Sequence, residues 1–366
     1  MDHGGIENWL MNILRAINRD LFHIDFLFHT TKASAYDEEI LDLGSNIFRC
    51  PCPKRPLKYS KYLRELIKNN GPYNVIHSHV HHFSGWVLRS AHQAEIPIRI
   101  AHSHSNITDL ISKSSWIRRA YYNYMKYLVR KYSSIGIAAS NQSAISLFGQ
   151  KWKTDHRCQV VHCGIDVDLF NKSVDQSSIR RKLGIPSNSF VVGHVGRFSK
   201  EKNHLFIIDV FAEIIKKNPS VRLLLVGDGK YLPNIKKLST TKRLCNNIIL
   251  TGSRNDIVEL MLGAMDVFLF PSLWEGLGLA IVEAQAAGLP CIISEHIPYE
   301  AEIVPQLIYR VPLSKRAKEW AKIIIDIHKM KKMGGISQHK SLQIVLNSAF
   351  NLKVGMLQLE SIYKQK

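Results

Sequence analysis

Residues 270–284 read FPSLWEGLGLAIVEA and carry the most informative pattern of the chain. The apolar run that ends at Phe270 predicts a buried strand, and the glycines that follow predict a loop leading into a helix near Gly278. Glu275 then lies in the loop, and Glu283 lies in the second turn of the helix. Backbone N–H groups at a helix start can bind a phosphate or sugar oxygen, and each carboxylate can accept two hydroxyl hydrogen bonds. The stretch predicts a site for a phosphorylated or polyhydroxylated ligand in an α/β domain, and its structural alternative is a capped helix with one solvated glutamate.

The same strand–loop–helix pattern occurs at residues 190–217, where a strand is followed by Gly196 and Arg197. Arg197 can pair with phosphate oxygens, and Lys202, five residues further on, can act there as a point charge. Two such cations would neutralise a diphosphate leaving group. Taken alone, a Gly-Arg turn near lysines is also typical of an ordinary surface.

Short apolar runs alternate with amphipathic helical patterns over most of the sequence, which indicates βαβ units and parallel sheets. A length of 366 residues fits two domains. We therefore expect two Rossmann-like domains, residues 1–165 and 166–340, with ligands at the carboxyl ends of both sheets. The predicted strands are 24–28, 74–77, 98–102, 190–195, 221–227, 247–252, 267–270 and 291–294.

Gly4 and Gly5 open the first predicted helix, and glycines there let a ligand approach the backbone closely. A strand normally precedes such a turn, but only Met1-Asp2-His3 does so in this sequence. We expect the first strand of the N-terminal domain to be missing, which would leave backbone groups of the sheet unpaired.

Histidines follow two predicted strands of the first half, and the His-x-His spacing places alternate rings on one face of a strand. The six are His77, His79, His81, His82, His102 and His104. A zinc site is the alternative to a polar cleft that orients substrate hydroxyls, but no carboxylate or thiol is suitably spaced nearby, and we expect no metal.

Composition narrows the class of protein. The net charge of +19 favours phosphates, nucleic acid or an anionic membrane leaflet as partners. The six cysteines fit no zinc spacing and are expected to be reduced thiols. Neither a secretory signal nor a membrane-spanning run is visible, which predicts a cytoplasmic protein.

Residues 110–154 contain no acidic residue and interleave aromatic with basic side chains. A basic amphipathic helix with aromatic edges is typical of a membrane-surface element, and its alternative is a domain helix with a solvated face. Nucleic-acid binding fits the charge but no recognition motif, so we expect none.

Together these residues resemble the retaining glycosyltransferases of the GT-B fold, and particularly the bacterial capsular and exopolysaccharide enzymes of glycosyltransferase family four. The resemblance rests on Glu275 with Glu283, on Gly196-Arg197 with Lys202, on Gly4-Gly5-Ile6-Glu7 and on the joint at 161–166, and it covers nearly the entire chain. It implies a sugar transferred from a nucleotide-sugar donor, with UDP-sugar favoured, to a growing, lipid-linked polysaccharide. It also implies no metal or other cofactor, and a last helix within 341–366 that returns to the first domain.

The resemblance implies a role for each candidate residue. Arg197 and Lys202 would bind the diphosphate, Glu283 the ribose and Glu275 the transferred sugar. The other donor contacts would be Gly196, Leu277, Gly278, Leu279, Ser253 and Arg254, the cleft would be lined by Gly4, Gly5, His79 and His104, and His102 is preferred as the catalytic histidine.

Two departures from the family pattern are the absent first strand and Cys163, which stands where the family has Asn. Two other functions stay open on sequence alone. One is a GT-B sugar-nucleotide epimerase, which would need no acceptor, and the other is a non-catalytic sugar-nucleotide-binding protein. A peripheral contact with the inner face of the cytoplasmic membrane fits the basic aromatic stretch.

Overall fold

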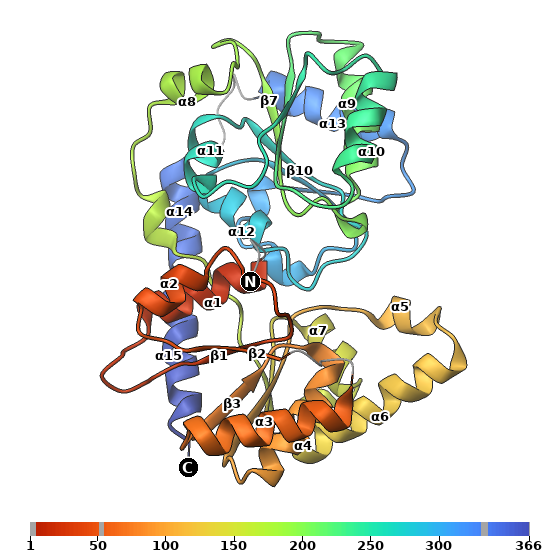
Figure 1. Ribbon diagram of the computed structural model, residues 1–366. Coiled ribbons are helices and arrows are strands. Elements are labelled where there is room, and N and C mark those ends of the chain that lie inside the picture. Colours follow the sequence, from red (N-terminus) through yellow and green to blue (C-terminus); the bar gives the residue numbers. More distant parts are fainter. Residues whose placement is uncertain (1–4, 51–54, 331–335, 366) are drawn as a thin grey trace. The chain divides into compact units, whose positions relative to one another are not determined.

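The structure is a computed structural model that describes residues 5–50, 55–330 and 336–365. It divides the chain into two compact units: unit 1 is Met1–Gly164 with Leu352–Lys366, and unit 2 is Ile165–Asn351. Each unit has parallel strands covered by helices, so the predicted α/β class is confirmed (Figure 1).

Unit 2 is built on one six-stranded parallel sheet in the order β12-β11-β10-β7-β8-β9. Its strands are β7 Val191–Val195, β8 Arg222–Val226, β9 Ile248–Leu250, β10 Val267–Phe270, β11 Cys291–Ser294 and β12 Ile308–Val311. Its helices are α8 Gln176–Lys182, α9 His204–Ile215, α10 Leu232–Thr241, α11 Ile257–Gly263, α12 Leu279–Ala286, α13 Ala317–Met330 and α14 Gln338–Leu346.

Successive residues of a strand point to opposite faces of this sheet, and each face packs against its own layer of helices. Val192 and Leu223 belong to the apolar layer with α9 and α13, whereas Val191 and Leu224 belong to the layer with α12 and α14. Strands buried in the middle of such a sheet read as continuous apolar runs, and the sequence revealed five of these six.

Unit 1 contains two separate parallel sheets, one of four strands in the order β3-β4-β5-β6 and one of two, β1-β2. The strands are β1 Phe26–Phe28, β2 Ile47–Arg49, β3 Val75–Ser78, β4 Ile98–Ser103, β5 Ile135–Ala138 and β6 Cys158–Val160. The helices are α1 Gly5–Ala16, α2 Asp37–Asp42, α3 Pro56–Asn70, α4 Ser84–Gln93, α5 Thr108–Ser112, α6 Trp116–Tyr132, α7 Asn141–Phe148 and α15 Leu352–Tyr363.

The C-terminal segment differs from the predicted single helix. It forms two helices, α14 in unit 2 and α15 in unit 1, so the return begins at Leu352 and not near residue 341. Backbone pairing fixes the segment between α14 and α15: Ile165 N–H donates to the carbonyl of Phe350 at 2.8 Å, and Ile165 forms a β-bridge with Asn351.

Every strand predicted from the sequence is present, but β2, β5, β6 and β12 were missed. In β5 the strand pattern is interrupted by Gly136, where a Cβ would lie 2.8 Å from Sγ of Cys158. The glycine is therefore a packing requirement that periodicity does not reveal. Among the described residues, no helix is both long and apolar enough to cross a membrane.

Candidate active site

In unit 2, four loops meet at the carboxyl edge of the sheet, which is the edge where parallel α/β sheets bind ligands. Gly196 follows β7 and donates its N–H to the carbonyl of Val226 at 3.0 Å. Gly227 follows β8 and donates to the carbonyl of Gly252, after β9, at 2.9 Å. The fourth loop follows β10 and contains Glu275. Backbone pairing thus joins the loops after β7, β8 and β9, and the loops after β7 and β9 contain residues predicted from the sequence.

Gly227 and Gly229 were missed by the sequence reasoning. Their φ angles are +138° and +150°, and a Cβ would lie 2.1 Å from the carbonyl oxygen of Gly196 and 2.5 Å from that of Phe198, respectively. Only glycine fits at such contacts. The Gly-Asp-Gly signal directly after a predicted strand could have identified this loop.

Lys202 and Glu275, predicted to act on the same donor, are in direct contact. The Nζ atom of Lys202 lies 2.7 Å from Oε1 of Glu275 and 4.5 Å from the centre of the Phe270 ring. The two side chains are only 17% and 12% exposed. Such a charge-assisted pair fixes both groups at the end of β10.

The loop after β7 positions the neighbouring cation. A Cβ at Gly196 would lie 3.3 Å from Cε of Lys202, so the glycine leaves room for the lysine stem. Arg197 is exposed, unlike the half-buried Lys202. The predicted pair of cations therefore consists of one anchored and one solvated side chain.

The start of α12 supplies hydrogen-bond donors at the same edge. Gly278 caps the helix with φ +92°, the left-handed region that glycine favours. Leu277 is buried in the core, and Leu279 is the first helical residue. The sequence-predicted backbone contacts thus lie at a helix N-terminus, where N–H groups are available to an anion.

Glu283 lies one turn into α12 and is half-buried. Desolvation raises the pKa of its carboxyl from 4.5 to about 7. Ionisation is unfavourable there without hydrogen-bond donors, and the hydroxyls of a ribose are donors of that kind.

Ser253 and Arg254 are exposed in the loop after β9. The Arg254 guanidinium pairs with Asp256, its Nη2 lying 2.6 Å from Oδ2 and its Nε 2.8 Å from Oδ1. Arg254 is therefore engaged locally, which the sequence did not indicate.

In unit 1, four of the predicted histidines form a cluster at the ends of β3 and β4, in which His102 and His104 are buried and His77 and His79 are half-buried. His77 Nε2 lies 3.0 Å from His102 Nδ1, and His79 Nδ1 lies 2.8 Å from His104 Nε2. The rings of His102 and His104 stack with their centroids 3.8 Å apart. The alternating spacing therefore does place these rings together. His102, the histidine preferred from the sequence, is fully buried.

Burial sets the charge of this histidine cluster. Desolvation lowers the pKa of His79 from 6.5 to about 3, and that of His77, His102 and His104 well below 6.5. Neutral rings can exchange single hydrogen bonds with one another, and His77 Nδ1 also lies 2.7 Å from the hydroxyl of Tyr363.

The same cluster offers two groups of metal-ligand atoms. The atoms of His77, His79 and His102 lie within 4.8 Å of one another, as do those of His102, His104 and Cys163. The ring contacts of 3.0 and 2.8 Å are hydrogen-bond distances, so a metal would have to replace them.

Gly5, the second predicted cleft glycine, is the first residue of α1, while Gly4 lies outside the described residues. Apart from its chain neighbours and its own helix, no atom of the described residues lies within 4 Å of a Cβ built on Gly5. The helix that it opens carries Trp9, whose ring lies 5.3 Å from that of His102.

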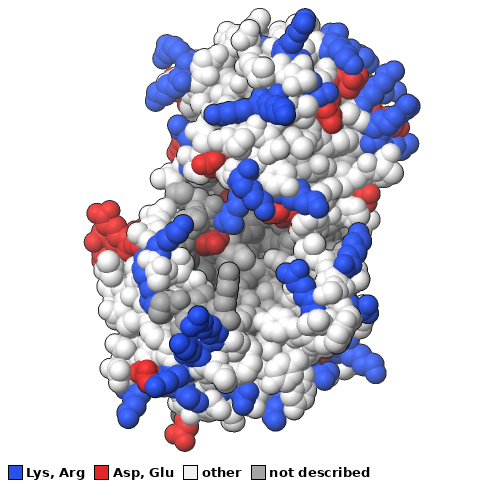
Figure 2. Space-filling view, turned by 45° about the vertical axis from the view of Figure 1, so that its right-hand side comes forward, with Lys and Arg blue, Asp and Glu red and all other residues white. Residues whose placement is uncertain are grey.

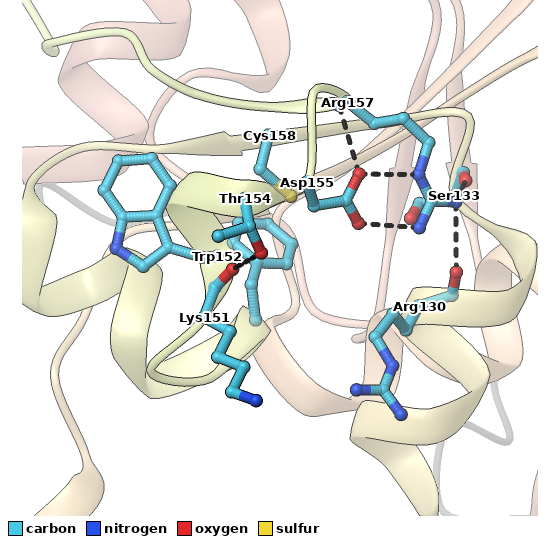
Figure 3. Close-up of a pocket in the computed structure, with 9 residues that line it drawn as sticks. Arg130, Ser133, Lys151, Trp152, Thr154, Asp155, Arg157 and Cys158 are labelled. Carbon is cyan, nitrogen blue, oxygen red and sulfur yellow. Dashed lines mark hydrogen bonds and ion pairs between the residues drawn. The ribbon is translucent and has the colours of Figure 1, made fainter.

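A pocket of about 260 Å³ lies elsewhere in unit 1 (Figure 3). Its residues precede β5 and β6, at the amino edge of the sheet and away from the histidine cluster. Arg157 is already paired there with Asp155 at 2.7 and 2.9 Å, and it donates to the carbonyls of Arg130 and Ser133. This pocket therefore differs from the predicted donor site, both in its position at the amino edge of a sheet and in having its arginine already paired.

Helix α6 carries the basic aromatic stretch and presents an apolar, exposed face. Trp116 is 78% exposed and Ile117 is 62% exposed, and Tyr121, Tyr124 and Tyr127 are also exposed. On the face shown in Figure 2, lysines and arginines are scattered and do not gather in one patch.

Comparison with known families assigns both halves of the chain. Residues 3–169 match Glycosyltransferase Family 4, and residues 175–335 match Glycosyl transferases group 1. The division at about residue 170 lies close to the boundary between the two units.

Two relatives and one structure illustrate the likeness. "Putative glycosyltransferase EpsF" of Bacillus subtilis is 33% identical over 88% of this chain and 84% of its own length. The UDP-Gal:alpha-D-GlcNAc-diphosphoundecaprenol alpha-1,3-galactosyltransferase of Escherichia coli is 27% identical over 79% and 76%. The crystal structure of Anabaena HepE in complex with UDP and glucose superposes with a TM-score of 0.81 at 22% identity, covering 99% of this chain and 96% of HepE.

Proposed function

Because this chain belongs to glycosyltransferase family 4 and has the GT-B fold, we propose that it moves a sugar from a nucleotide-sugar donor to a growing, lipid-linked polysaccharide, with retention of the anomeric configuration. In this proposal, unit 2 binds the donor and unit 1 binds the acceptor. The observation that carries it is the meeting of Lys202, Glu275 and the start of α12 at one edge of the unit 2 sheet.

The charges at this edge suit a sugar diphosphate. Lys202 and Arg197 would neutralise the phosphates as the bond to the sugar breaks, and the N–H groups at the start of α12 would bind phosphate or sugar oxygens. Glu275 would accept hydrogen bonds from the sugar hydroxyls, and Glu283 from the ribose. The proposal includes no metal or other cofactor, because the two cations take the charge-neutralising role.

UDP is the proposed nucleotide. It is supported by the name of the Escherichia coli relative, a galactosyltransferase that uses UDP-Gal, and by the UDP complex of HepE. The relative's diphosphoundecaprenol acceptor supports a lipid-linked acceptor here.

The histidine cluster gives unit 1 a role in acceptor binding. Neutral imidazoles can orient hydroxyl groups without adding charge, and His79 and His104 would do so. His102 is fully buried and stacks on His104, so we propose it as the residue that positions the other rings.

Helix α6 would hold the enzyme on the inner leaflet of the cytoplasmic membrane. Its exposed Trp116 and Ile117 fit the boundary between headgroups and acyl chains, and Arg118 and Arg119 fit anionic headgroups. This location would bring unit 1 to an acceptor that is anchored in lipid.

The donor site is tested by thermal unfolding with UDP, GDP, ADP and CMP. A ligand at a hundred times its Kd stabilises a protein by about 2.7 kcal/mol, which corresponds to a shift of several degrees. We expect a shift with UDP that Glu283→Ala abolishes. A cooperative transition that no nucleotide moves would contradict the donor assignment.

The reaction is tested with UDP-sugars and a diphospholipid-linked sugar. Transfer with an unchanged anomeric configuration, read from the proton NMR coupling of the new linkage, would support the proposal. Conversion of the UDP-sugar without acceptor would instead identify an epimerase.

A further inference from the structure

The histidine cluster of unit 1 has a thiol beside it that the sequence spacing does not reveal. Cys163 follows β6, and its Sγ atom lies 3.5 Å from Nδ1 of His104, although the two residues are 59 positions apart in the chain. Ligand atoms of His102, His104 and Cys163 lie within 4.8 Å of one another, and all three residues are buried. Two imidazoles and a thiolate are ligands that zinc prefers.

The hydrogen bonds between the rings use one nitrogen of each of these two histidines. Nδ1 of His102 lies 3.0 Å from Nε2 of His77, and Nε2 of His104 lies 2.8 Å from Nδ1 of His79. A metal placed between the rings would have to replace these contacts. An ion bound by the other two nitrogens, Nε2 of His102 and Nδ1 of His104, would keep them.

The ring contacts would then orient the ligand nitrogens. When Nε2 of His102 binds an ion, the proton of the neutral ring lies on Nδ1 and is donated to His77, whose own Nδ1 lies 2.7 Å from the hydroxyl of Tyr363. In the same way, His104 would donate from Nε2 to His79. A ligand histidine normally donates its second N–H to such a partner, which holds the ring in its ligating orientation.

The distance between Cys163 and His104 fits a shared zinc ion. Zinc bonds of about 2.3 Å to sulfur and about 2.0 Å to nitrogen place these two atoms about 3.5 Å apart at a tetrahedral angle. Burial raises the pKa of the Cys163 thiol, so the thiol keeps its proton unless an ion replaces it. Binding of the ion would therefore form a zinc–thiolate bond and release one proton to the solvent.

Two buried polar atoms support an ion at this place. Nε2 of His102 and Nε1 of Trp9 have no hydrogen-bond partner among the described residues, although both side chains belong to residues that are at most 2% exposed. A buried polar atom without a partner costs free energy. An ion would satisfy the nitrogen of His102. A water molecule bound to the ion would accept the N–H of Trp9, whose ring centre lies 5.3 Å from that of His102.

We propose that unit 1 binds one Zn²⁺ ion through Nε2 of His102, Nδ1 of His104 and Sγ of Cys163, with a water molecule as the fourth ligand. The ion would join the ends of β4 and β6, which are separated by β5 in the sheet. It is a structural ion that has no part in neutralising the diphosphate. The site does not depend on the proposed sugar transfer, but it leaves His79, and not His104, to bind an acceptor.

The test titrates the full chain, freed of metal by a chelator, with Zn²⁺ and with Co²⁺, whose spectrum reports its ligands. Cys163→Asn removes the thiolate, and Asn is the residue that the resembled family has at this position, so we expect the variant to fold. Cys158→Ser and Cys245→Ser are the controls, because they remove a half-buried thiol of unit 1 and an exposed thiol of unit 2. A cooperative thermal transition confirms that each variant is folded.

We expect one Zn²⁺ per chain, a melting temperature that rises on binding, and a thiolate-to-cobalt charge-transfer band beside the visible bands of tetrahedral Co²⁺. Cys163→Asn should remove the charge-transfer band, and the two controls should keep both the band and the affinity. His79→Gln should keep the band but weaken zinc binding by about 10- to 100-fold, because it removes the partner that orients His104.

The proposal is overturned by a folded chain that binds no zinc, by a charge-transfer band that persists in Cys163→Asn, or by equal losses in the two cysteine controls. Binding of Cu²⁺ with exclusion of Zn²⁺ would overturn the choice of ion. None of these readouts involves a donor or an acceptor, so failure of this site is distinguishable from failure of the proposed function.

Discussion

Units 1 and 2 follow the same α/β plan but differ in completeness. Unit 2 has one continuous six-stranded sheet between two apolar layers, whereas the described residues of unit 1 form two sheets and a pocket of about 1100 Å³ that is lined by β1 and β3. The proposed donor residues therefore lie on a continuous sheet, and the histidine cluster lies beside the pocket. If the proposed roles are right, mutations can damage nucleotide binding and acceptor binding separately.

The chemistry of the two units differs as well. Unit 2 holds a charged pair, Lys202 with Glu275, at the end of a strand. Unit 1 holds four rings whose pKa values burial lowers, so that they are neutral near pH 7. Each unit thus predicts its own response to mutation and to pH.

The largest effect is expected from Lys202→Ala, which should lower turnover about 10²- to 10³-fold by removing a cation that stabilises the leaving diphosphate. Lys200→Ala is the matched control, since Lys200 is exposed in the same turn. Steady-state kinetics with donor and acceptor measures both. Near-normal turnover after replacing Arg197 and Lys202 together would remove them from the mechanism.

Gly227→Ala should destabilise unit 2 by about 2–4 kcal/mol, since the new Cβ would lie 2.1 Å from the carbonyl oxygen of Gly196 at φ +138°. Gly44→Ala in unit 1 is the control: its φ is +79°, but no atom lies within 4 Å, so it should cost only about 1 kcal/mol. Urea unfolding followed by hydrogen exchange separates the units. Equal losses would mean that the contact between the two glycine loops is not rigid.

These residues show how far the sequence reaches. Motif spacing located Lys202 with Glu275, and His-x-His alternation located the ring cluster, because both depend on which residues share a strand end. The sequence could not predict that Arg254 pairs with Asp256 or that His102 is fully buried, because both depend on side-chain packing.

Acidification should weaken unit 1 by about 2 kcal/mol per buried histidine between pH 6.5 and 5. A histidine whose folded pKa is depressed binds its proton more readily when unfolded, so stability is lost as pH falls below the unfolded value of 6.5. Burial also lowers the pKa of His194 and His204 in unit 2, against four rings in the unit 1 cluster, so hydrogen exchange at pH 7 and pH 5 should show a larger loss of protection in β3 and β4 than in β10. Unchanged protection in β3 and β4 would contradict the neutral, buried cluster.

Glu283 should make the affinity for nucleotide rise with pH. Its pKa is raised to about 7, so ionisation destabilises the folded unit as pH rises from about 4.5 to 7, while ribose hydroxyls favour the carboxylate. Affinity for UDP should therefore rise about tenfold between pH 6 and pH 8, as the ionised fraction grows. Calorimetric titration measures it, and Glu283→Gln should abolish the dependence. A pH-independent Kd in the unmodified chain would place the ribose elsewhere.

The smallest effect is expected on the surface of α6, where Arg119→Gln should weaken binding to vesicles containing phosphatidylglycerol by about 1 kcal/mol, roughly fivefold. Lys237→Gln, an exposed substitution on α10 of unit 2, is the charge-matched control and should leave binding unchanged. Vesicle flotation at low and high salt measures both, because headgroup attraction weakens as salt screens it. If the two variants lose binding equally, the attraction comes from the overall charge of +19 and α6 has no special part in it.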